Sequence, residues 1–260
     1  MSNNKLLNTA IVAATEAGTK IIELYQSDEY QTEYKSDQSP LTQADKAAHR
    51  IISAKLSATP HPLLSEEGLI SDYKTRKKWN TFWLVDPLDG TKEFIKKNGE
   101  FTVNIALIHH EKPILGVIYI PVTRELYFAD ENGAYKSSFS PEIENIYEKA
   151  QNLPLQYHHS EYIVAASGSH MNIETEQYIK SLQTNNKPLK IISKGSSIKF
   201  CLVAEGSVHC YPRMSPTMEW DTAAGHAIAH FAGKSVTSHP NGKPLQYNKN
   251  DLRNPNFVVN

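Results

Sequence analysis

Apolar residues recur every three or four positions in two stretches near the start of the chain. These stretches cover residues 5–26 and run from about Thr42 to Leu56. This spacing predicts two amphipathic helices, each with one apolar face. Thr42 is a residue type that often caps a helix, and the polar stretch before it ends in a Ser-Pro pair that favours a loop. We therefore expect two N-terminal helices that pack against a core.

The middle of the chain shows short apolar runs that are typical of strands. They cover residues 81–85, 101–109, 114–121 and 125–129. The connections between the last three runs are too short for a crossover, so these strands are expected to be antiparallel neighbours. Beyond them the pattern predicts strands at 162–166, 189–192 and 208–211, and helices at 173–182, 198–204 and 222–231.

Helices that flank mostly antiparallel strands predict a layered α+β fold. The length of 260 residues fits one large domain or two closely joined halves. A polar, irregular stretch at about 135–160 is the expected divide. We therefore assign residues 1–150 to an N-terminal α+β half and residues 151–260 to a C-terminal α/β half.

The net charge of the chain argues against some classes of binding partner. The chain has 27 Lys and Arg against 28 Asp and Glu, a formal net charge of -1. Nucleic acid and anionic membranes attract basic proteins, so neither is expected as the main partner. A local basic pocket for a small anion stays open.

Targeting signals and cysteines bear on location. The N-terminus has no apolar core of a secretion signal, and the longest apolar run, residues 114–120, is far too short for a transmembrane segment. Cys201 and Cys210 form no CxxC pair and are interpreted as buried thiols in a reducing compartment. A cytoplasmic location is expected, and peripheral association with the inner face of the cell membrane is left open.

The clearest chemical motif is DPLDGT at residues 86–91, directly after the strand expected at 81–85. Its proline and glycine favour a turn that can direct Asp86 and Asp89 to one point. Oxygen ligands without imidazole or thiolate suit Mg2+. A short helix that begins at Thr91 adds free N–H groups, which favour an anion. Together these features predict hydrolysis of a phosphate ester.

Two more acidic sites strengthen this interpretation. Glu66 and Glu67 follow a strand-like pair of leucines, and Asp221 precedes the helix expected at 222–231. Each site alone is more often a solvated carboxylate or a helix cap. Three acidic sites at strand exits and helix starts are better explained by one shared metal site.

Other phosphate chemistries are excluded or disfavoured by spacing. An aspartyl-phosphate mechanism uses Asp-x-Asp, whereas Asp86 and Asp89 are three residues apart. The chain contains neither the P-loop pattern GxxxxGK[ST] nor the dinucleotide pattern GxGxxG.

The combination of DPLDGT at 86–91, the glutamates at 66–67 and WDTAAG at 220–225 closely resembles the inositol monophosphatase superfamily. These are Mg2+-dependent, lithium-inhibitable phosphatases. DGTKEFI at 89–95, NGEFTVN at 98–104 and GSSIKFC at 195–201 resemble its 3'(2'),5'-bisphosphate nucleotidase branch. The resemblance implies a layered αβαβα sandwich with the site between the halves. Most metal ligands would lie in the first half, and Asp221 and the nucleotide-binding residues in the second.

The resemblance also implies roles for single residues. The matching metal ligands, for about two or three Mg2+ ions, are Glu66, Asp86, Leu88 through its carbonyl, Asp89 and Asp221. The group that orients and deprotonates the attacking water is Thr91 with Asp45 or Glu66. The residues that match substrate contacts are Glu66, Leu88, Asp89, Gly90, Thr91, Ser169, His170, Ser196, Lys199, Arg213 and Asp221.

The expected activity is removal of the 3'-phosphate from adenosine 3',5'-bisphosphate, which yields AMP and phosphate and recycles the nucleotide left by sulfate activation. Inositol monophosphate and fructose 1,6-bisphosphate are alternative substrates, and a nucleotide-binding regulator without turnover is a further alternative. Lys199 and Arg213 favour a substrate with a second phosphate, although a lysine at a helix edge is usually just solvated. The oligomeric state is left open.

Overall fold

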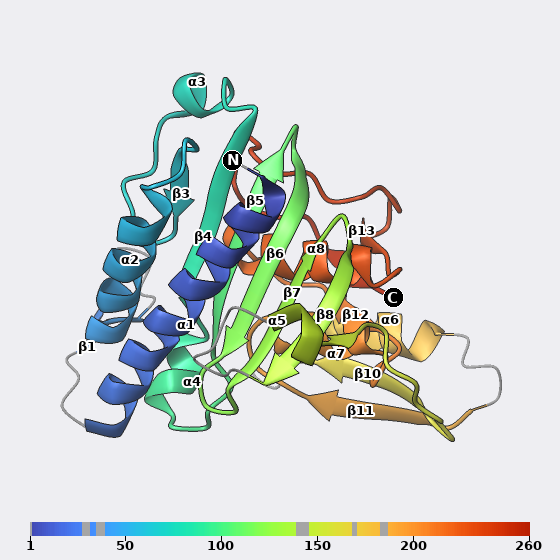
Figure 1. The fold of residues 1–260 in the computed structure, drawn as a ribbon. Helices are drawn as coiled ribbons and strands as arrows, with labels where there is room; N and C mark the ends of the chain where they lie inside the picture. The colour runs from blue at the N-terminus through green and yellow to red at the C-terminus, as the bar shows by residue number, and fades with distance from the viewer. Residues whose placement is uncertain (1, 28–31, 35–39, 139–145, 168–170, 183–186) are drawn as a thin grey trace.

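The computed structural model describes residues 2–27, 32–34, 40–138, 146–167, 171–182 and 187–260, and it forms layers of helix and sheet (Figure 1). The central layer is a seven-stranded sheet in the order β3-β4-β5-β6-β7-β8-β9. Its strands are β3 (Leu63–Ser65), β4 (Thr81–Asp89), β5 (Thr102–His109), β6 (Lys112–Ile120), β7 (Glu125–Asp130), β8 (Gly133–Ser138) and β9 (Gln151–Asn152). Only β3 and β4 pair in parallel within this sheet.

Helices cover both faces of the sheet. One face carries α1 (Asn3–Ser27) and α2 (Gln43–Leu56), and the other carries α7 (Ile198–Glu205) and α8 (Glu219–Phe231). A fourth layer holds β10 (Tyr162–Ala166), β11 (Leu189–Ser193), β12 (Tyr211–Arg213), β13 (Val236–Ser238) and β14 (Phe257–Val259). Outside it lies α6 (Ile173–Ser181). The expected αβαβα sandwich with mostly antiparallel strands is confirmed.

Short elements complete the chain. They are β1 (Thr32–Tyr34), β2 (Pro40–Thr42), α3 (Tyr73–Arg76), α4 (Thr91–Ile95) and α5 (Ile146–Lys149). The polar stretch at 135–160 is less irregular than expected, because β8, α5 and β9 occupy part of it and two of them extend the central sheet.

The alternation of side chains along β5 divides the core. Val103, Ile105 and Leu107 pack with α1 and α2, whereas Ala106 and Ile108 pack on the side of α7 and α8. Both faces of the strand are buried, which explains its nearly continuous apolar sequence. Asn104 has the same parity as Ala106, so this polar residue lies on the side of α7 and α8.

Close approach of α8 to the sheet depends on Gly116 in β6. A Cβ at this position would collide with the carbonyl oxygen of Ala224 and crowd the Ala227 side chain. The absence of a side chain therefore lets the helix rest directly on the strand.

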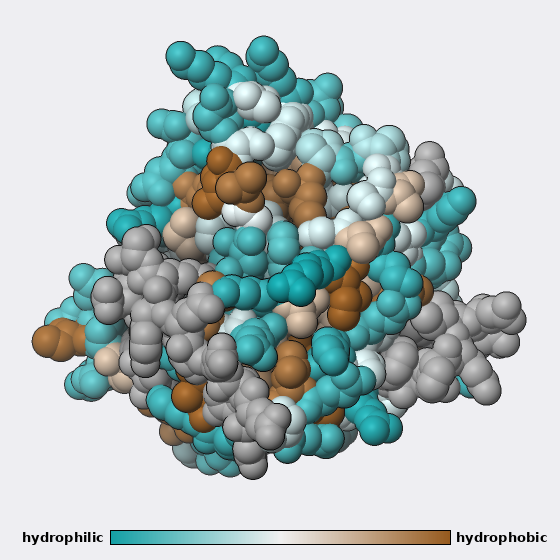
Figure 2. Space-filling model, turned by 90° about the vertical axis from the view of Figure 1, so that its left-hand side faces the viewer, coloured by the Kyte–Doolittle hydropathy of each residue, from teal (hydrophilic) through white to brown (hydrophobic). Residues whose placement is uncertain are grey.

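The distribution of polar residues and the burial of the cysteines are consistent with this layered core. Hydrophilic residues cover most of the described surface seen in Figure 2, and apolar residues there form separate patches. Within the described residues, no helix is both long enough and apolar enough to cross a bilayer. Cys201 and Cys210 are buried free thiols, as expected from the sequence.

Candidate active site

A bulge at the end of β4 brings two carboxylates to one side of the sheet. The strand was expected to end at Val85, but it continues to Asp89. Asp86 pairs with Asn104 and Asp89 pairs with Thr102, so two residues of β4 lie opposite one residue of β5 between these pairs. Side chains three residues apart on a regular strand point to opposite faces. The extra residue of the bulge reverses this and lets both aspartates reach the same site.

Two other chain segments bring carboxylates to Asp86. Glu66 follows β3, and its backbone N–H donates to the Val85 carbonyl at 3.1 Å. Asp221 is the third residue of α8, which begins at Glu219 rather than at the expected position 222. One carboxylate oxygen from each of Glu66, Asp86 and Asp221 lies within 4.8 Å of the other two. Three distant parts of the sequence thus form one acidic cluster.

The electrostatics of this cluster favour a bound cation. Burial and the neighbouring carboxylates hold the pKa values of Asp86 and Asp221 well above the ordinary value. Burial also raises the pKa of Asp89 to about 6, against an opposing effect of Lys199. Close carboxylates repel one another unless a proton or a cation lies between them. A hard divalent cation with oxygen ligands fits this donor set.

Thr91 and Asp45 form a second part of the site. Thr91 Oγ1 donates to Asp45 Oδ1 at 3.0 Å. The other carboxylate oxygen of Asp45 accepts the backbone N–H and the hydroxyl of Thr42 at 2.7 and 2.6 Å, which caps α2. Burial raises the pKa of Asp45, and these hydrogen bonds oppose the rise. The Thr91 hydroxyl is therefore held in one direction, with its lone pairs free to accept from a water molecule.

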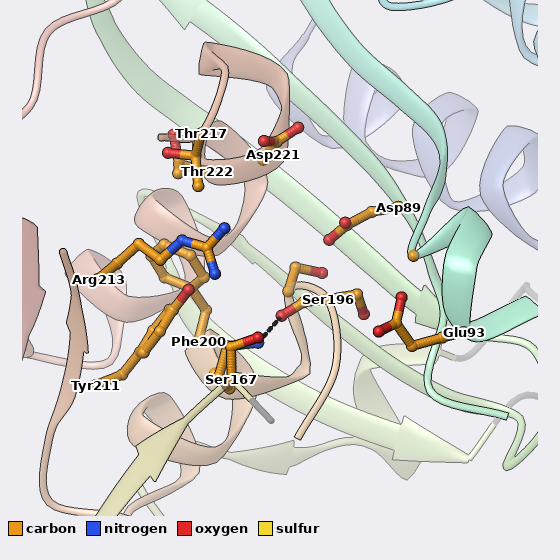
Figure 3. A pocket seen from close by; sticks show the side chains of 13 residues that line it. Asp89, Glu93, Ser167, Ser196, Phe200, Tyr211, Arg213, Thr217, Asp221 and Thr222 are labelled. Atoms are coloured by element: carbon orange, nitrogen blue, oxygen red, sulfur yellow. Dashed lines mark hydrogen bonds between the residues drawn. The ribbon is translucent and has the colours of Figure 1, made fainter. Parts of the chain in front are cut away.

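A pocket extends from the carboxylates toward the C-terminal part of the chain (Figure 3). Asp89 lies on one side, and the Arg213 guanidinium is directed into the space from the opposite side. An Arg213 nitrogen donates to the Pro216 carbonyl at 3.3 Å, while its buried Nε has no hydrogen-bond partner among the described residues. The pocket thus places the Arg213 guanidinium opposite the Asp89 carboxylate.

Lys199 lines the same pocket but is not solvated. It is 2% exposed, and its ammonium donates to the carbonyls of Lys194 and Ser196 at 2.9 and 2.7 Å. Burial lowers its pKa to about 8, although Asp89 opposes this effect. The alternative of a solvated lysine at a helix edge is wrong. Two of its three N–H groups hold the turn at 194–197, and only the third remains for another partner.

The other predicted residues divide into those near the pocket and those that are not described. Ser196 lines the pocket, and Gly90, with a φ of 95°, caps α4 beside it. The Leu88 carbonyl accepts a long hydrogen bond of 3.4 Å from Thr91. Ser169 and His170 lie outside the described residues.

Sequence reasoning missed several residues of the pocket. They are Glu93, Ser197, Phe200, Tyr211, Thr217 and Thr222. Most lie within three residues of a motif that the sequence analysis had selected, so proximity to a motif was the available signal. Their direction toward the pocket depends on packing between the layers, which no local pattern reveals.

Comparisons with known proteins agree with the motifs. The model of the inositol monophosphatase family matches residues 2–259. The 3'(2'),5'-bisphosphate nucleotidase CysQ of Escherichia coli strain K12 is 45% identical over 258 residues, which cover 98% of this chain and 99% of that protein. The protein of the same name from Haemophilus influenzae is 34% identical over 99% of this chain and 93% of its own length.

Solved structures show the same likeness. The crystal structure of CysQ from Bacteroides thetaiotaomicron has a TM-score of 0.88 and 52% identity, and the match covers 96% of this chain and 95% of that one. An IMPase from Thermotoga maritima has a TM-score of 0.75 over 98% of this chain and 91% of that one. Its identity is 20%, so this second likeness concerns the fold alone.

Proposed function

Because the chain belongs to the inositol monophosphatase family, we propose that it is a 3'(2'),5'-bisphosphate nucleotidase. It hydrolyses the 3'-phosphate of adenosine 3',5'-bisphosphate to AMP and phosphate, in the nucleotide recycling that accompanies sulfate assimilation. One observation carries the proposal: Asp221, which belongs to the acidic cluster, lines the same pocket as Asp89 and Arg213. The nearly full-length likeness to proteins named CysQ supports this choice of substrate.

The family is metal-dependent, generally on Mg2+, and the acidic cluster fits that ion. We assign Glu66, Asp86 and Asp221 to one ion, with Asp89 and the Leu88 carbonyl completing a set for about two or three ions. When bound, the metal lowers the pKa of a coordinated water and offsets charge on the phosphate.

The chain's own residues supply positioning. Thr91, oriented by Asp45, accepts a hydrogen bond from the attacking water and fixes its direction. Glu66 lies among the carboxylates and is the alternative acceptor for the water proton. Phosphoryl transfer needs orientation and charge stabilisation more than covalent help from the protein, so this division of roles suits the reaction.

Binding of the nucleotide is assigned to the far side of the pocket. Arg213 offers N–H groups to the phosphate that does not react. Lys199 contributes positive charge and holds the turn that presents Ser196. Ser169 and His170 stay predictions from the resemblance, with Gly90 at the side of the scissile phosphate. In this proposal residues 1–150 carry most metal ligands, and residues 151–260 carry Asp221 and the nucleotide contacts.

We propose a cytoplasmic enzyme whose partner is a small nucleotide bisphosphate rather than a nucleic acid. Peripheral contact with the inner face of the cell membrane stays a prediction.

Phosphate release by the purified protein in Mg2+ tests the proposed function. Adenosine 3',5'-bisphosphate, inositol 1-phosphate and fructose 1,6-bisphosphate are compared, and an Asp89→Asn variant controls for contaminating phosphatase. We expect a strong preference for the nucleotide. Preference for either sugar phosphate would retain the metal site and refute the nucleotide assignment. Nucleotide binding without release would instead support the regulator.

A further inference from the structure

Three buried polar side chains form a small cluster beside the pocket, which one of them, Ser197, also lines. Thr102 and Asn104 lie on β5, and Ser197 precedes α7. Ser197 Oγ donates to Asn104 Oδ1 at 2.7 Å, and Thr102 Oγ1 lies 2.7 Å from Ser197 Oγ and 3.1 Å from Asn104 Oδ1. All three residues are at most 2% exposed. Burial of so many polar groups is favourable only when they satisfy one another, as they do here.

The cluster reaches Asp89 in two ways. The amide nitrogen of Asn104 is directed at Asp89 Oδ2 at 3.4 Å. The backbone N–H of Ser197 also donates to the Asp89 carboxylate. Asp89 is thus oriented both by the neighbouring strand and by the segment that begins α7.

The same cluster supports the turn at 194–197 that borders the pocket. Ser196 in this turn has a φ of 43°, which is strained for a residue other than glycine. The Gly195 N–H donates to Glu100 Oε2 at 2.7 Å, and Lys199 donates to the Ser196 carbonyl. Thr102 Oγ1 lies 3.4 Å from Ser196 Oγ. The turn is therefore held in one shape before any ligand enters.

We propose that Asn104 is a positioning residue that joins this turn to Asp89, so that one buried unit sets both the metal-binding carboxylate and the wall of the nucleotide pocket. Only the role of the turn in nucleotide binding rests on the proposed function, whereas the role of Asn104 in orienting Asp89 does not. Its oxygen fixes the hydroxyls of the turn and its nitrogen fixes Asp89, so neither an apolar nor a purely accepting side chain can replace it.

Binding of Mg2+ in the absence of nucleotide is the primary test, measured by calorimetry. Asn104→Ala is expected to weaken Mg2+ binding on the order of tenfold, as loss of a hydrogen-bond partner behind a metal ligand commonly does. We expect kcat to fall by a similar factor, with a smaller change in KM. Because Asn104 and Ser197 act as one unit, the double variant with Ser197→Ala should lose less than the product of the two single effects.

Two further variants separate positioning from general stabilisation. Thr15→Ala removes another buried hydroxyl, which donates to the Ile11 carbonyl within α1, and should lower Tm without changing Mg2+ affinity or kcat. Thr102→Val keeps the volume of the side chain and the Asn104 contact to Asp89. It should therefore raise KM for the nucleotide more than it weakens Mg2+ binding, and it carries the test if Asn104→Ala does not fold.

The proposal is overturned if Asn104→Ala binds Mg2+ within about twofold of the parent protein, or if the two single effects multiply in the double variant. It also fails if Thr102→Val leaves KM unchanged. A parent protein that binds Mg2+ but releases no phosphate from the nucleotide refutes the proposed function alone. The change in Mg2+ affinity then still decides the role of Asn104.

Discussion

Two regions of the molecule bury carboxylates in opposite ways. In the first region, Glu205 at the end of α7 accepts hydrogen bonds from Tyr127 on β7, Lys136 on β8 and Ser207 at 2.7–2.8 Å. In the acidic cluster at the end of β4, Asp86 and Asp221 instead have carboxylates as their main charged neighbours. The chain neutralises the first region with its own lysine, whereas the second needs a charge from outside. A buried acid is thus informative about function when its own chain does not balance it.

The pKa directions express the same difference. Burial raises the pKa of Glu125, but hydrogen bonds from Lys136 and Thr123 outweigh it and leave the pKa below the ordinary value. Burial raises the pKa of Asp89. Lys199 lowers this pKa and Glu66 raises it further, so that it stays at about 6. One region therefore stabilises its charged form, and the other resists it until a cation binds.

Removal of the Asp89 charge, next to the acidic cluster, should have the largest effect on activity. Asp89→Asn is expected to lower kcat by about a thousandfold or more, because the metal site supplies several kcal/mol of transition-state stabilisation. Tm without metal should stay the same or rise, since a repelling charge is lost. Steady-state phosphate release and thermal unfolding check this. Asp72→Asn, at the exposed cap of α3, is the matched control and should keep full activity.

A change at Glu205, whose charge is balanced by Lys136, should lower stability and leave activity unchanged. Among the described residues, Glu205→Ala leaves Glu125 as the one ion-pair partner of Lys136, and it removes the hydrogen-bond acceptor of the Tyr127 hydroxyl. We expect a loss of about 3 kcal/mol in the free energy of unfolding, with kcat unchanged, because a broken buried pair is costly. Urea titration measures this. Glu161→Ala, which breaks an exposed pair with Lys190, should cost less than about 1 kcal/mol. Equal losses in the two variants would contradict the comparison.

The cation on the far wall of the pocket should act on binding rather than on stability. Arg213→Ala is expected to raise KM for adenosine 3',5'-bisphosphate on the order of tenfold, through loss of charge-assisted hydrogen bonds to phosphate. KM for a simple nucleoside monophosphate should change less. Arg50→Ala on the exposed face of α2 serves as the control. An equal rise in both KM values would remove Arg213 from recognition of the second phosphate.

The smallest expected effect is a pH dependence of stabilisation by Mg2+. A carboxyl whose pKa rises from 3.8 to about 6 on folding destabilises the metal-free protein increasingly as pH rises through that interval. Bound Mg2+ removes this cost. The gain in Tm on adding Mg2+ should therefore be larger at pH 7.5 than at pH 5 by about 3 °C. A gain that is equal at both pH values would show that the carboxylates are already balanced without metal.

The sequence predicted the parts of the site that local motifs encode. DPLDGT gave the two aspartates and the short helix after them, and Thr42 marked the start of α2. It did not predict the bulge between Asp86 and Asp89, because a bulge is a property of pairing with β5. Pro87 within the strand was its available signal, since proline in a sheet favours such irregular positions.

Residues that act through long-range contacts were the harder part. Lys199 looked like a solvated lysine or a phosphate ligand, and its two carbonyl partners depend on the shape of the 194–197 turn. Asn104 was visible as a polar position within an apolar strand. Its contact with Ser197 joins residues 93 positions apart, which no local pattern specifies. The layers were therefore predictable, whereas the connections between them were not.

The missing side chain at Gly116 has a consequence for how variation in this chain should be interpreted. α8 rests on the backbone of β6 there, and Asp221 lies in the first turn of that helix. The contact at Gly116 therefore helps to set the position of Asp221 relative to the carboxylates at the end of β4, although Gly116 has no side chain in the site. Even one added methyl group would collide with the Ala224 carbonyl oxygen and displace α8 from the sheet. In a mutational survey, position 116 should therefore be as intolerant of replacement as the proposed ligand positions, although glycine has no side chain that could bind a metal.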